Sequence, residues 1–158
     1  MNTFEKIIEK IPLLLEELNN KSMLKKGDTY INQSCIPKKG IYVLFENSKP
    51  IYVGRSNNIK QRLRDHSNPG SDHYSATFAF RLAAREYEKK YCKSTKGILR
   101  KDLKNDRYFN ILFLDAKARV SEMGIKTINI DDQITQTIFE VYAAMKLGTL
   151  EFNSFDNH

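Results

Sequence analysis

Cysteine is scarce in this sequence of 158 residues, and its apolar runs are short. Cys35 and Cys92 are the only cysteines, and they form neither a CxxC pair nor a Cys/His cluster. The sequence therefore predicts neither a zinc site nor a disulfide framework. The runs Ile41–Phe45 and Ile111–Leu114 are far shorter than the ~18 apolar residues that a membrane span needs. We expect no membrane segment.

The N-terminus also lacks the pattern of a secretory signal. Acidic and basic side chains alternate there, at Glu5, Lys6, Glu9 and Lys10, where a signal peptide has a basic start and an unbroken apolar stretch. We therefore expect a cytoplasmic protein. The length is close to the ~150 residues of one domain, and 41% hydrophobic residues are enough to build a core.

Positive charge is concentrated in the middle of the chain. The sequence has 26 Lys and Arg against 19 Asp and Glu, and residues 38–107 alone hold 17 basic against seven acidic residues. Tyrosines are interleaved with these arginines and lysines, a mixture that suits a phosphate backbone and stacked bases. Solvated helix faces explain the same charge equally well.

The first 37 residues read as an amphipathic helix followed by a linker. Apolar residues recur at helical spacing at Phe4, Ile7, Ile8, Ile11, Leu14, Leu15 and Leu18. Residues 19–37 read as a loop that leads into the core. The apolar stripe of this helical arm must be covered, and a homodimer through the N-terminal helix is one way to cover it.

Residues 38–158 read as an α+β core. Residues 40–45 and 50–54 are β-branched and aromatic runs that predict an antiparallel hairpin. Predicted helices cover about 57–66, 75–91 and 109–123, and a third strand covers 125–130. A last helix begins at Asp131 or Asp132, ends at Gly148, and carries Ile134, Ile138, Val141 and Met145 on one face. The expected fold is a small three-stranded, mainly antiparallel sheet flanked by helices, with a helical insertion at about 75–123.

Two tripeptides on the predicted hairpin connect this core with a known family. Gly40-Ile41-Tyr42 and Tyr52-Val53-Gly54 resemble the paired tripeptides of the GIY-YIG nucleases. The resemblance extends over about residues 38–155, because Arg62 follows Tyr52 by ten residues, His66 lies one helical turn later, and Asn153 follows Glu140 by thirteen. The family fold, a small antiparallel sheet between helices, agrees with the elements predicted above.

The resemblance implies an endonuclease that hydrolyses DNA with a divalent metal ion. Glu140 matches the family's glutamate and is the implied ligand of Mg²⁺, with Mn²⁺ as a substitute, because one carboxylate and several waters suffice for this ion. Arg62 would bind the scissile phosphate with its planar fork of donors, and Arg55 would bind phosphate or favour a neighbouring phenolate.

Three residues compete for the role of general base. By the resemblance, Tyr42 and Tyr52 lean together into the site, and we prefer Tyr42. A phenol with a pKa near ~10 needs cations nearby to act as a base at neutral pH. His66 has an ordinary pKa better suited to proton transfer, and it could bind phosphate instead.

Other residues are assigned to substrate binding. They are His73, Arg81, Arg85 and Asn153, and the resemblance also allows Asn153 to tie the C-terminal segment to the core. The expected partner is DNA, and RNA stays open. A noncatalytic nucleic-acid-binding module on the same fold is the main alternative, and an interaction protein that uses the N-terminal helix is a third.

Overall fold

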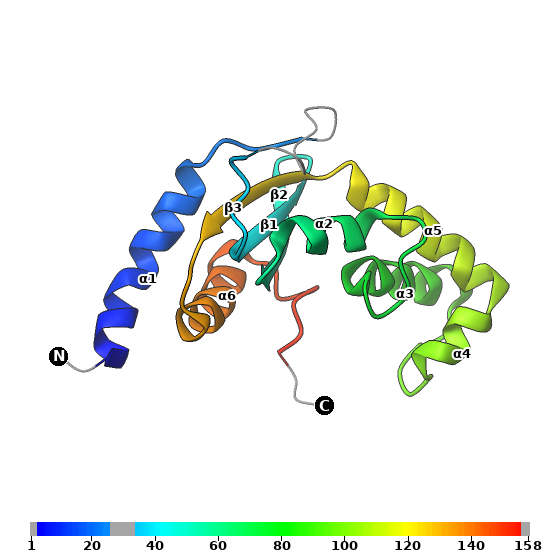
Figure 1. Cartoon of the computed structure of the whole chain (residues 1–158). Helices are drawn as coiled ribbons and strands as arrows, with labels where there is room; N and C mark the ends of the chain where they lie inside the picture. Colours follow the sequence, from blue (N-terminus) through cyan, green and yellow to red (C-terminus); the bar gives the residue numbers. More distant parts are fainter. Residues whose placement is uncertain (1–2, 26–33, 156–158) are drawn as a thin grey trace. The chain divides into compact units, whose positions relative to one another are not determined.

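The computed structural model describes residues 3–25 and 34–155 and contains two compact units (Figure 1). The first unit comprises residues 1–61 and 123–158, and the second comprises residues 62–122. In chain order the elements are α1 (Thr3–Asn20), β1 (Gly40–Glu46), β2 (Lys49–Ser56), α2 (Ile59–Ser67), α3 (Thr77–Tyr91), α4 (Arg100–Asn105), α5 (Arg107–Ser121), β3 (Gly124–Asn129) and α6 (Gln133–Leu147). The predicted α+β class is confirmed, and the predicted helical insertion falls inside the second unit.

The predicted hairpin is present, with longer strands and a tighter turn than expected. Only Asn47 and Ser48 separate β1 from β2, and both have positive φ, 49° and 65°. Two such residues make the mirror-image turn whose twist matches that of the flanking strands. The register shifts once, between Leu44 and Phe45.

The sheet has the order β2-β1-β3, and both pairs of strands are antiparallel. Gly40 begins β1 with φ of 138°, and a Cβ atom there would collide with the carbonyl oxygen of Ile128 in β3. The first residue of the first tripeptide must therefore be glycine, because β3 approaches its backbone too closely for a side chain.

The core of the first unit lies where α1 and α6 pack against the sheet (Figure 1). Ile41 and Val43 of β1 are buried in it, together with Ile11 and Leu18 of α1. The N-terminal helix thus packs on its own chain through part of its apolar stripe, whereas Phe4 and Ile8 of that stripe are 61% and 42% exposed. The homodimer stays a prediction.

The predicted start of the last helix is confirmed, but its predicted apolar face is not the buried one. Asp132 caps α6 by accepting a hydrogen bond from the backbone N–H of Thr135. Ile134 and Met145 are more than 60% exposed, at 62% and 63%. The buried residues of this helix are instead Gln136, Phe139, Ala143 and Ala144. Small alanines allow a close approach to the sheet, and the Gln136 amide donates a hydrogen bond of 2.6 Å to the Ile130 carbonyl.

The second unit is built around α3 and α5, the two helices predicted at 75–91 and 109–123. Phe80 of α3 packs against Phe109 and Phe113 of α5, with ring centroids 5.0 and 5.9 Å apart. The short helix α4 was not predicted. Asp106 follows it and caps α5, where its carboxylate accepts bonds from two backbone N–H groups.

A buried lysine fixes the loop between α2 and α3. Lys117 of α5 is 3% exposed, and its ammonium donates to the carbonyl oxygens of Pro69 and Ser71 at 2.6 and 2.9 Å. The same nitrogen lies 4.3 Å from the centre of the Phe113 ring. Burial lowers the pKa of this lysine. The loop is therefore anchored to the core of the unit by a charged group that water does not reach.

Part of the predicted linker lies outside the described residues, namely 26–33. Before this gap, Leu24 exchanges two backbone hydrogen bonds with Ile125, at 2.9 and 2.7 Å, and so adds one residue to the outer edge of β3. None of the helices described here has the length and apolar character that crossing a membrane requires.

Candidate active site

The two tripeptides fit together across the hairpin. Tyr42 and Gly54 are register partners on β1 and β2. A Cβ atom on Gly54 would collide with the ring and the hydroxyl of Tyr42. The last residue of the second tripeptide must therefore be glycine, because the tyrosine of the first tripeptide lies directly over it.

The two tyrosines of the tripeptides lie next to each other. The ring centroids of Tyr42 and Tyr52 are 6.2 Å apart and the rings are tilted by 47°. Tyr42 is completely buried, and Tyr52 is 7% exposed. The structure thus brings together two of the three residues that compete for the role of general base.

An ion pair joins the residue after the second tripeptide to α6. The Nε atom of Arg55 lies 2.9 Å from Oε2 of Glu140, with 47% of the Arg55 side chain and 17% of the Glu140 side chain exposed. Partly exposed pairs of this kind contribute only about 0.2–1 kcal/mol to stability, since water screens them. The main effect of the pair is to hold the carboxylate of Glu140, the predicted metal ligand, beside Arg55.

Asn153 binds the outer edge of β2 in the middle of the second tripeptide. Its Oδ1 accepts a hydrogen bond of 3.0 Å from the Val53 backbone N–H, and its Nδ2 donates one of 2.6 Å to the Val53 carbonyl. The hydroxyl of Thr149 donates to the same Oδ1 at 2.9 Å. These bonds give Asn153 a positioning role for the strand that carries Tyr52, and a direct contact with substrate stays a prediction.

In the second unit, Arg62 of α2 is tied to the start of α3. Its Nη1 donates to the Ser75 carbonyl at 2.9 Å and its Nη2 to the Thr77 hydroxyl at 3.4 Å. These two bonds fix the plane of the guanidinium. Its predicted contact with the scissile phosphate stays a prediction.

His66 lies one turn further along α2 and is completely buried. Burial and the charges of Arg62 and Arg81 lower the pKa of His66 from 6.5 to about 3. The imidazole is therefore neutral at pH 7. A group with so low a pKa is a weak proton acceptor, because general bases work best near the operating pH.

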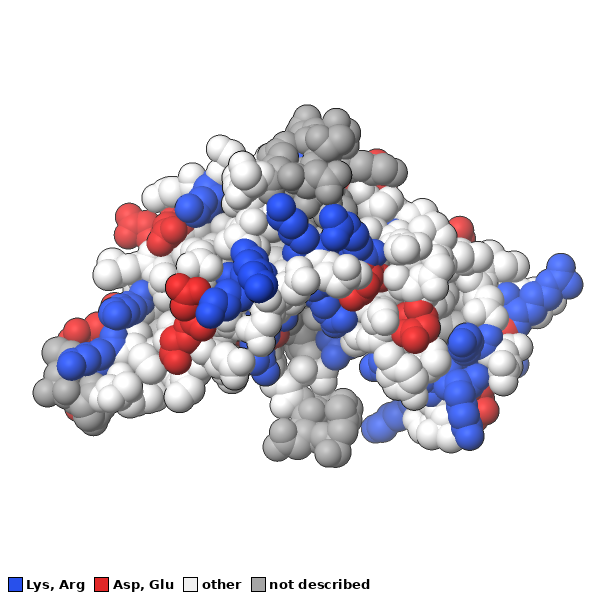
Figure 2. All heavy atoms as spheres, viewed as in Figure 1, with Lys and Arg blue, Asp and Glu red and all other residues white. Residues whose placement is uncertain are grey.

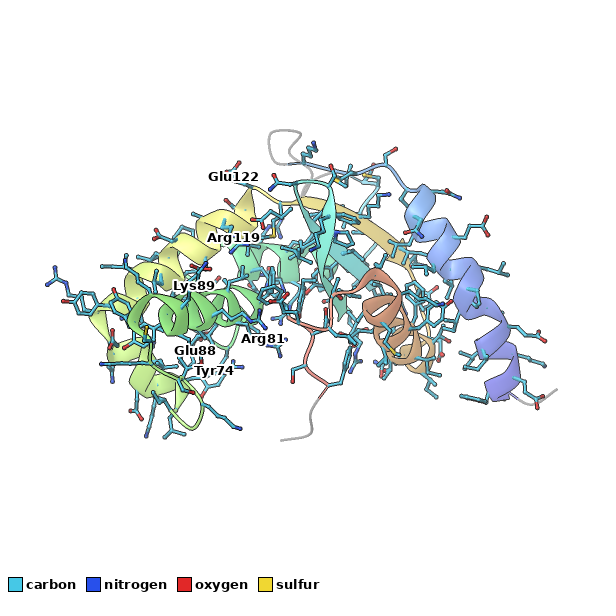
Figure 3. The ribbon with its side chains drawn as sticks, turned by 180° about the vertical axis from the view of Figure 1, so that it is seen from behind. Tyr74, Arg81, Glu88, Lys89, Arg119 and Glu122 are labelled. Atoms are coloured by element: carbon cyan, nitrogen blue, oxygen red, sulfur yellow. The ribbon has the colours of Figure 1, made fainter. Side chains whose placement is uncertain are left out.

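The remaining predicted substrate contacts also lie in the second unit. His73 is 6% exposed, Arg81 is half-buried and Arg85 is exposed. Arg85 and Arg81 lie one turn apart on α3, and Figure 3 shows Arg81 toward the start of that helix. Figure 2 shows lysines and arginines across the visible face with acidic side chains between them, so the charge on this face is mixed.

Glu140 is the predicted ligand of the metal ion. Within residues 3–25 and 34–155, no three His, Cys, Asp or Glu side chains are grouped so that they could hold a metal ion. Glu140 alone, with water ligands, fits the way in which Mg²⁺ is held by one or two carboxylates. A cavity of about 340 Å³ in the first unit is lined by other residues, among them Glu17, Lys21 and Thr127.

The hairpin and the helices that follow it match a catalytic domain of the nuclease type. Residues 38–93 match the family model described as the GIY-YIG catalytic domain. This part of the chain is thus similar to the catalytic domain of the GIY-YIG nucleases, as the tripeptides predict. The match includes Arg55, Arg62 and His66 and ends before Glu140 and Asn153. No curated protein and no solved structure matches the chain.

Several residues that position the site were not found from the sequence. Ser75 and Thr77 hold Arg62, and Thr149 holds Asn153. Thr149 lies four residues before Asn153, a spacing that brings side chains together on a helix. Gly148 ends α6 before both residues, so nothing in the sequence indicated a helix there. Ser75 contributes only its backbone carbonyl, which every residue has, so its residue type could not predict this contact.

Proposed function

We propose that the chain is a divalent-metal-dependent endonuclease that hydrolyses phosphodiester bonds of DNA. The match of residues 38–93 to the GIY-YIG catalytic domain supports nuclease chemistry in general. The observation that supports this chain's own activity most is the 2.9 Å pair between Arg55 and Glu140. In this pair the largely buried carboxylate of Glu140 lies next to Arg55, which directly follows the second tripeptide. Gly54 of that tripeptide packs against Tyr42.

Glu140 would hold the metal ion, Mg²⁺ or in its place Mn²⁺. The bound ion would supply charge stabilisation at the leaving oxygen of the phosphodiester. Arg55 keeps the Glu140 carboxylate in place through its Nε atom. Since its side chain is 47% exposed, the guanidinium can also turn toward a phosphate oxygen.

Tyr42 would act as the general base. Its phenol must lose a proton before it can accept one from water, and a nearby cation favours the phenolate. The low pKa of His66 supports a tyrosine over this histidine.

The arginines of the second unit would bind the DNA backbone. Arg62, held by Ser75 and Thr77, presents a fixed planar donor that suits the charge growing on a scissile phosphate. Arg81 and Arg85 would contact phosphates further along the strand, where each neutralised phosphate releases counterions. His73 would act within the same surface.

A noncatalytic nucleic-acid-binding module is the second candidate. The basic residues concentrated in 38–107 favour it, because they would bind a phosphate backbone without any catalytic group. The two candidates differ in what Glu140 is for: metal binding in a nuclease, and a structural link between β2 and α6 in a binding module.

The deciding experiment compares the wild type with Glu140→Gln on plasmid, linear and branched DNA and on RNA, in Mg²⁺, Mn²⁺ or EDTA. We expect metal-dependent cleavage by the wild type and none by the variant, because the amide cannot replace the charge that holds the cation. DNA binding in EDTA should persist or tighten, since an anion near the phosphate is gone. The exposed Glu151→Gln is the matched control and should cleave normally.

The opposite outcome is equally clear. If the wild type cleaves none of these substrates with either metal, and Glu140→Gln changes only the thermal unfolding midpoint, then the glutamate is structural. The binding-module candidate is then correct and the endonuclease proposal is wrong.

A further inference from the structure

One aromatic side chain of the second unit is exposed and yet held in place. Tyr74, in the loop between α2 and α3, is 68% exposed. Its backbone N–H and that of Ser75 both donate to Oδ1 of Asp72, at 2.9 and 2.8 Å. Such a turn, closed by an aspartate, fixes the backbone that carries the ring. The loop is further anchored by Lys117, which binds two of its carbonyl groups.

A buried imidazole supports the ring of Tyr74 from one side. The ring centroids of His73 and Tyr74 are 4.2 Å apart, with 39° between the planes. His73 is 6% exposed, and its two ring nitrogens have no hydrogen-bond partner in the part of the chain that the structure describes. Burial lowers the pKa of His73, so the ring is neutral. It serves here as a flat apolar support rather than as a hydrogen-bonding group.

An arginine side chain lies over the same ring. The Arg100 guanidinium is 6.0 Å from the centre of the Tyr74 ring and 5.0 Å from that of Phe80, and it donates to the His73 carbonyl at 3.1 Å. The charge of Arg81 is close enough to help lower the pKa of Arg100. None of the ion pairs found among the described residues involves Arg100. One guanidinium thus lies over the exposed aromatic ring, and the charge of a second lies close to the first.

We propose that Tyr74 is a stacking platform for an unpaired nucleobase and that Arg100 and Arg81 bind the phosphates next to that base. This inference rests on the proposed nuclease function and narrows its substrate to nucleic acid with a single-stranded part. A base inside a duplex has both faces covered by its neighbours, whereas an unpaired base offers a free face to an aromatic ring. Figure 3 shows Tyr74 and Arg81 toward the start of α3.

The charges favour a nucleic acid over a protein partner for this ring. Exposed tyrosines also serve as contact residues between proteins, but such interfaces need no excess of positive charge. The acidic side chain that contacts the Tyr74 backbone is Asp72, whose carboxylate is already used by the two backbone N–H groups. Stacked bases and guanidinium groups are the combination found in proteins that bind single strands.

The test measures binding in EDTA of a single-stranded thymidine oligonucleotide and of a duplex of the same length. Loss of one stacked base costs roughly tenfold in affinity, so Tyr74→Ala should bind the single strand about tenfold more weakly. Tyr74→Phe keeps the ring and should bind like the wild type. The control is Tyr108→Ala, which removes another tyrosine of this unit that is 57% exposed. The affinity of Tyr108→Ala for the single strand should stay within about twofold of the wild type. The affinity of Tyr74→Ala for the duplex should likewise stay within about twofold.

Two outcomes overturn the platform. Either Tyr74→Ala binds the single strand like the wild type, as it would if the ring contacts a protein, or it loses affinity for single strand and duplex equally. In both cases metal-dependent cleavage by the wild type would leave the proposed nuclease intact. If the wild type neither binds nor cleaves any nucleic acid, the nuclease proposal and the platform fail together.

Discussion

The burial of His66 predicts a specific dependence of stability on pH. The folded protein holds this imidazole with a pKa of about 3, lowered from 6.5 by burial and by the charges of Arg62 and Arg81. In the unfolded chain the same group takes up a proton near its ordinary pKa. As pH falls below 6.5, protons bind to the unfolded state and not to the folded one, so the folded state loses stability. Above 6.5 the imidazole is neutral in both states and adds no pH dependence.

The size of this loss of stability follows from the difference between the pKa of His66 in the unfolded and in the folded protein. Each pH unit within this window changes the free energy of unfolding by up to about 1.4 kcal/mol. Between pH 6.5 and pH 5, His66 alone should therefore remove roughly 2 kcal/mol. This is a large part of the ~5–15 kcal/mol that stabilises a typical domain. Ordinary carboxylates titrate mainly below this range, with pKa values near ~4.

Urea unfolding at several pH values measures this slope for the wild type and for His66→Leu, which removes the titrating group and keeps an apolar side chain in its place. We expect the wild type to lose stability steeply below pH ~6.5 and the variant to lose it less steeply, by up to about 1.4 kcal/mol per pH unit. A shallower slope remains in the variant, because burial also lowers the pKa of His73. Equal slopes in the two proteins would show that His66 titrates normally in the folded state, and the argument against it as a general base would then be wrong.

Two further predictions concern the tripeptides. Gly54→Ala should destabilise the protein by about 1–3 kcal/mol in urea unfolding, because the new methyl group meets the Tyr42 ring; additional replacement of Tyr42 by Ala should recover part of that loss, and strict additivity would contradict the contact. Tyr42→Phe keeps the ring but not the hydroxyl, so cleavage rates should fall by roughly 100-fold or more with little change in DNA affinity; a rate close to that of the wild type would move the general base to another group.

Local patterns in the sequence predicted the elements well, because each has a short-range cause. The hairpin follows from β-branched and aromatic runs around a turn, and α6 follows from Asp132 as a cap and Gly148 as a stop. Family resemblance added the tripeptides, and the structure supplies the reason for their glycines in the close packing at Gly40 and Gly54.

Long-range contacts could not be predicted in this way. The buried side of α6 carries Ala143 and Ala144 rather than the larger Ile134 and Met145. Small side chains let the helix pack close to the sheet, and the sequence pattern of large apolar residues does not show this. Lys117 looks like an ordinary surface lysine in the sequence, and only the fold gives it two carbonyl partners 46 and 48 residues away. Contacts between residues so far apart in the sequence leave no periodic pattern from which they could be predicted.

The two outer edges of the small sheet have a consequence for aggregation. A three-stranded open sheet exposes unpaired backbone groups on both outer strands, which can pair with strands of another copy. Here the Asn153 amide occupies both backbone groups of Val53 on β2, and Leu24 pairs with Ile125 on β3. The edge of β2 is thus blocked near its middle and that of β3 near its start, each by a single residue from a distant part of the chain. Loss of the Asn153 amide would free the Val53 edge of β2 for pairing between molecules, so the contact that positions the strand of Tyr52 also works against assembly through the sheet.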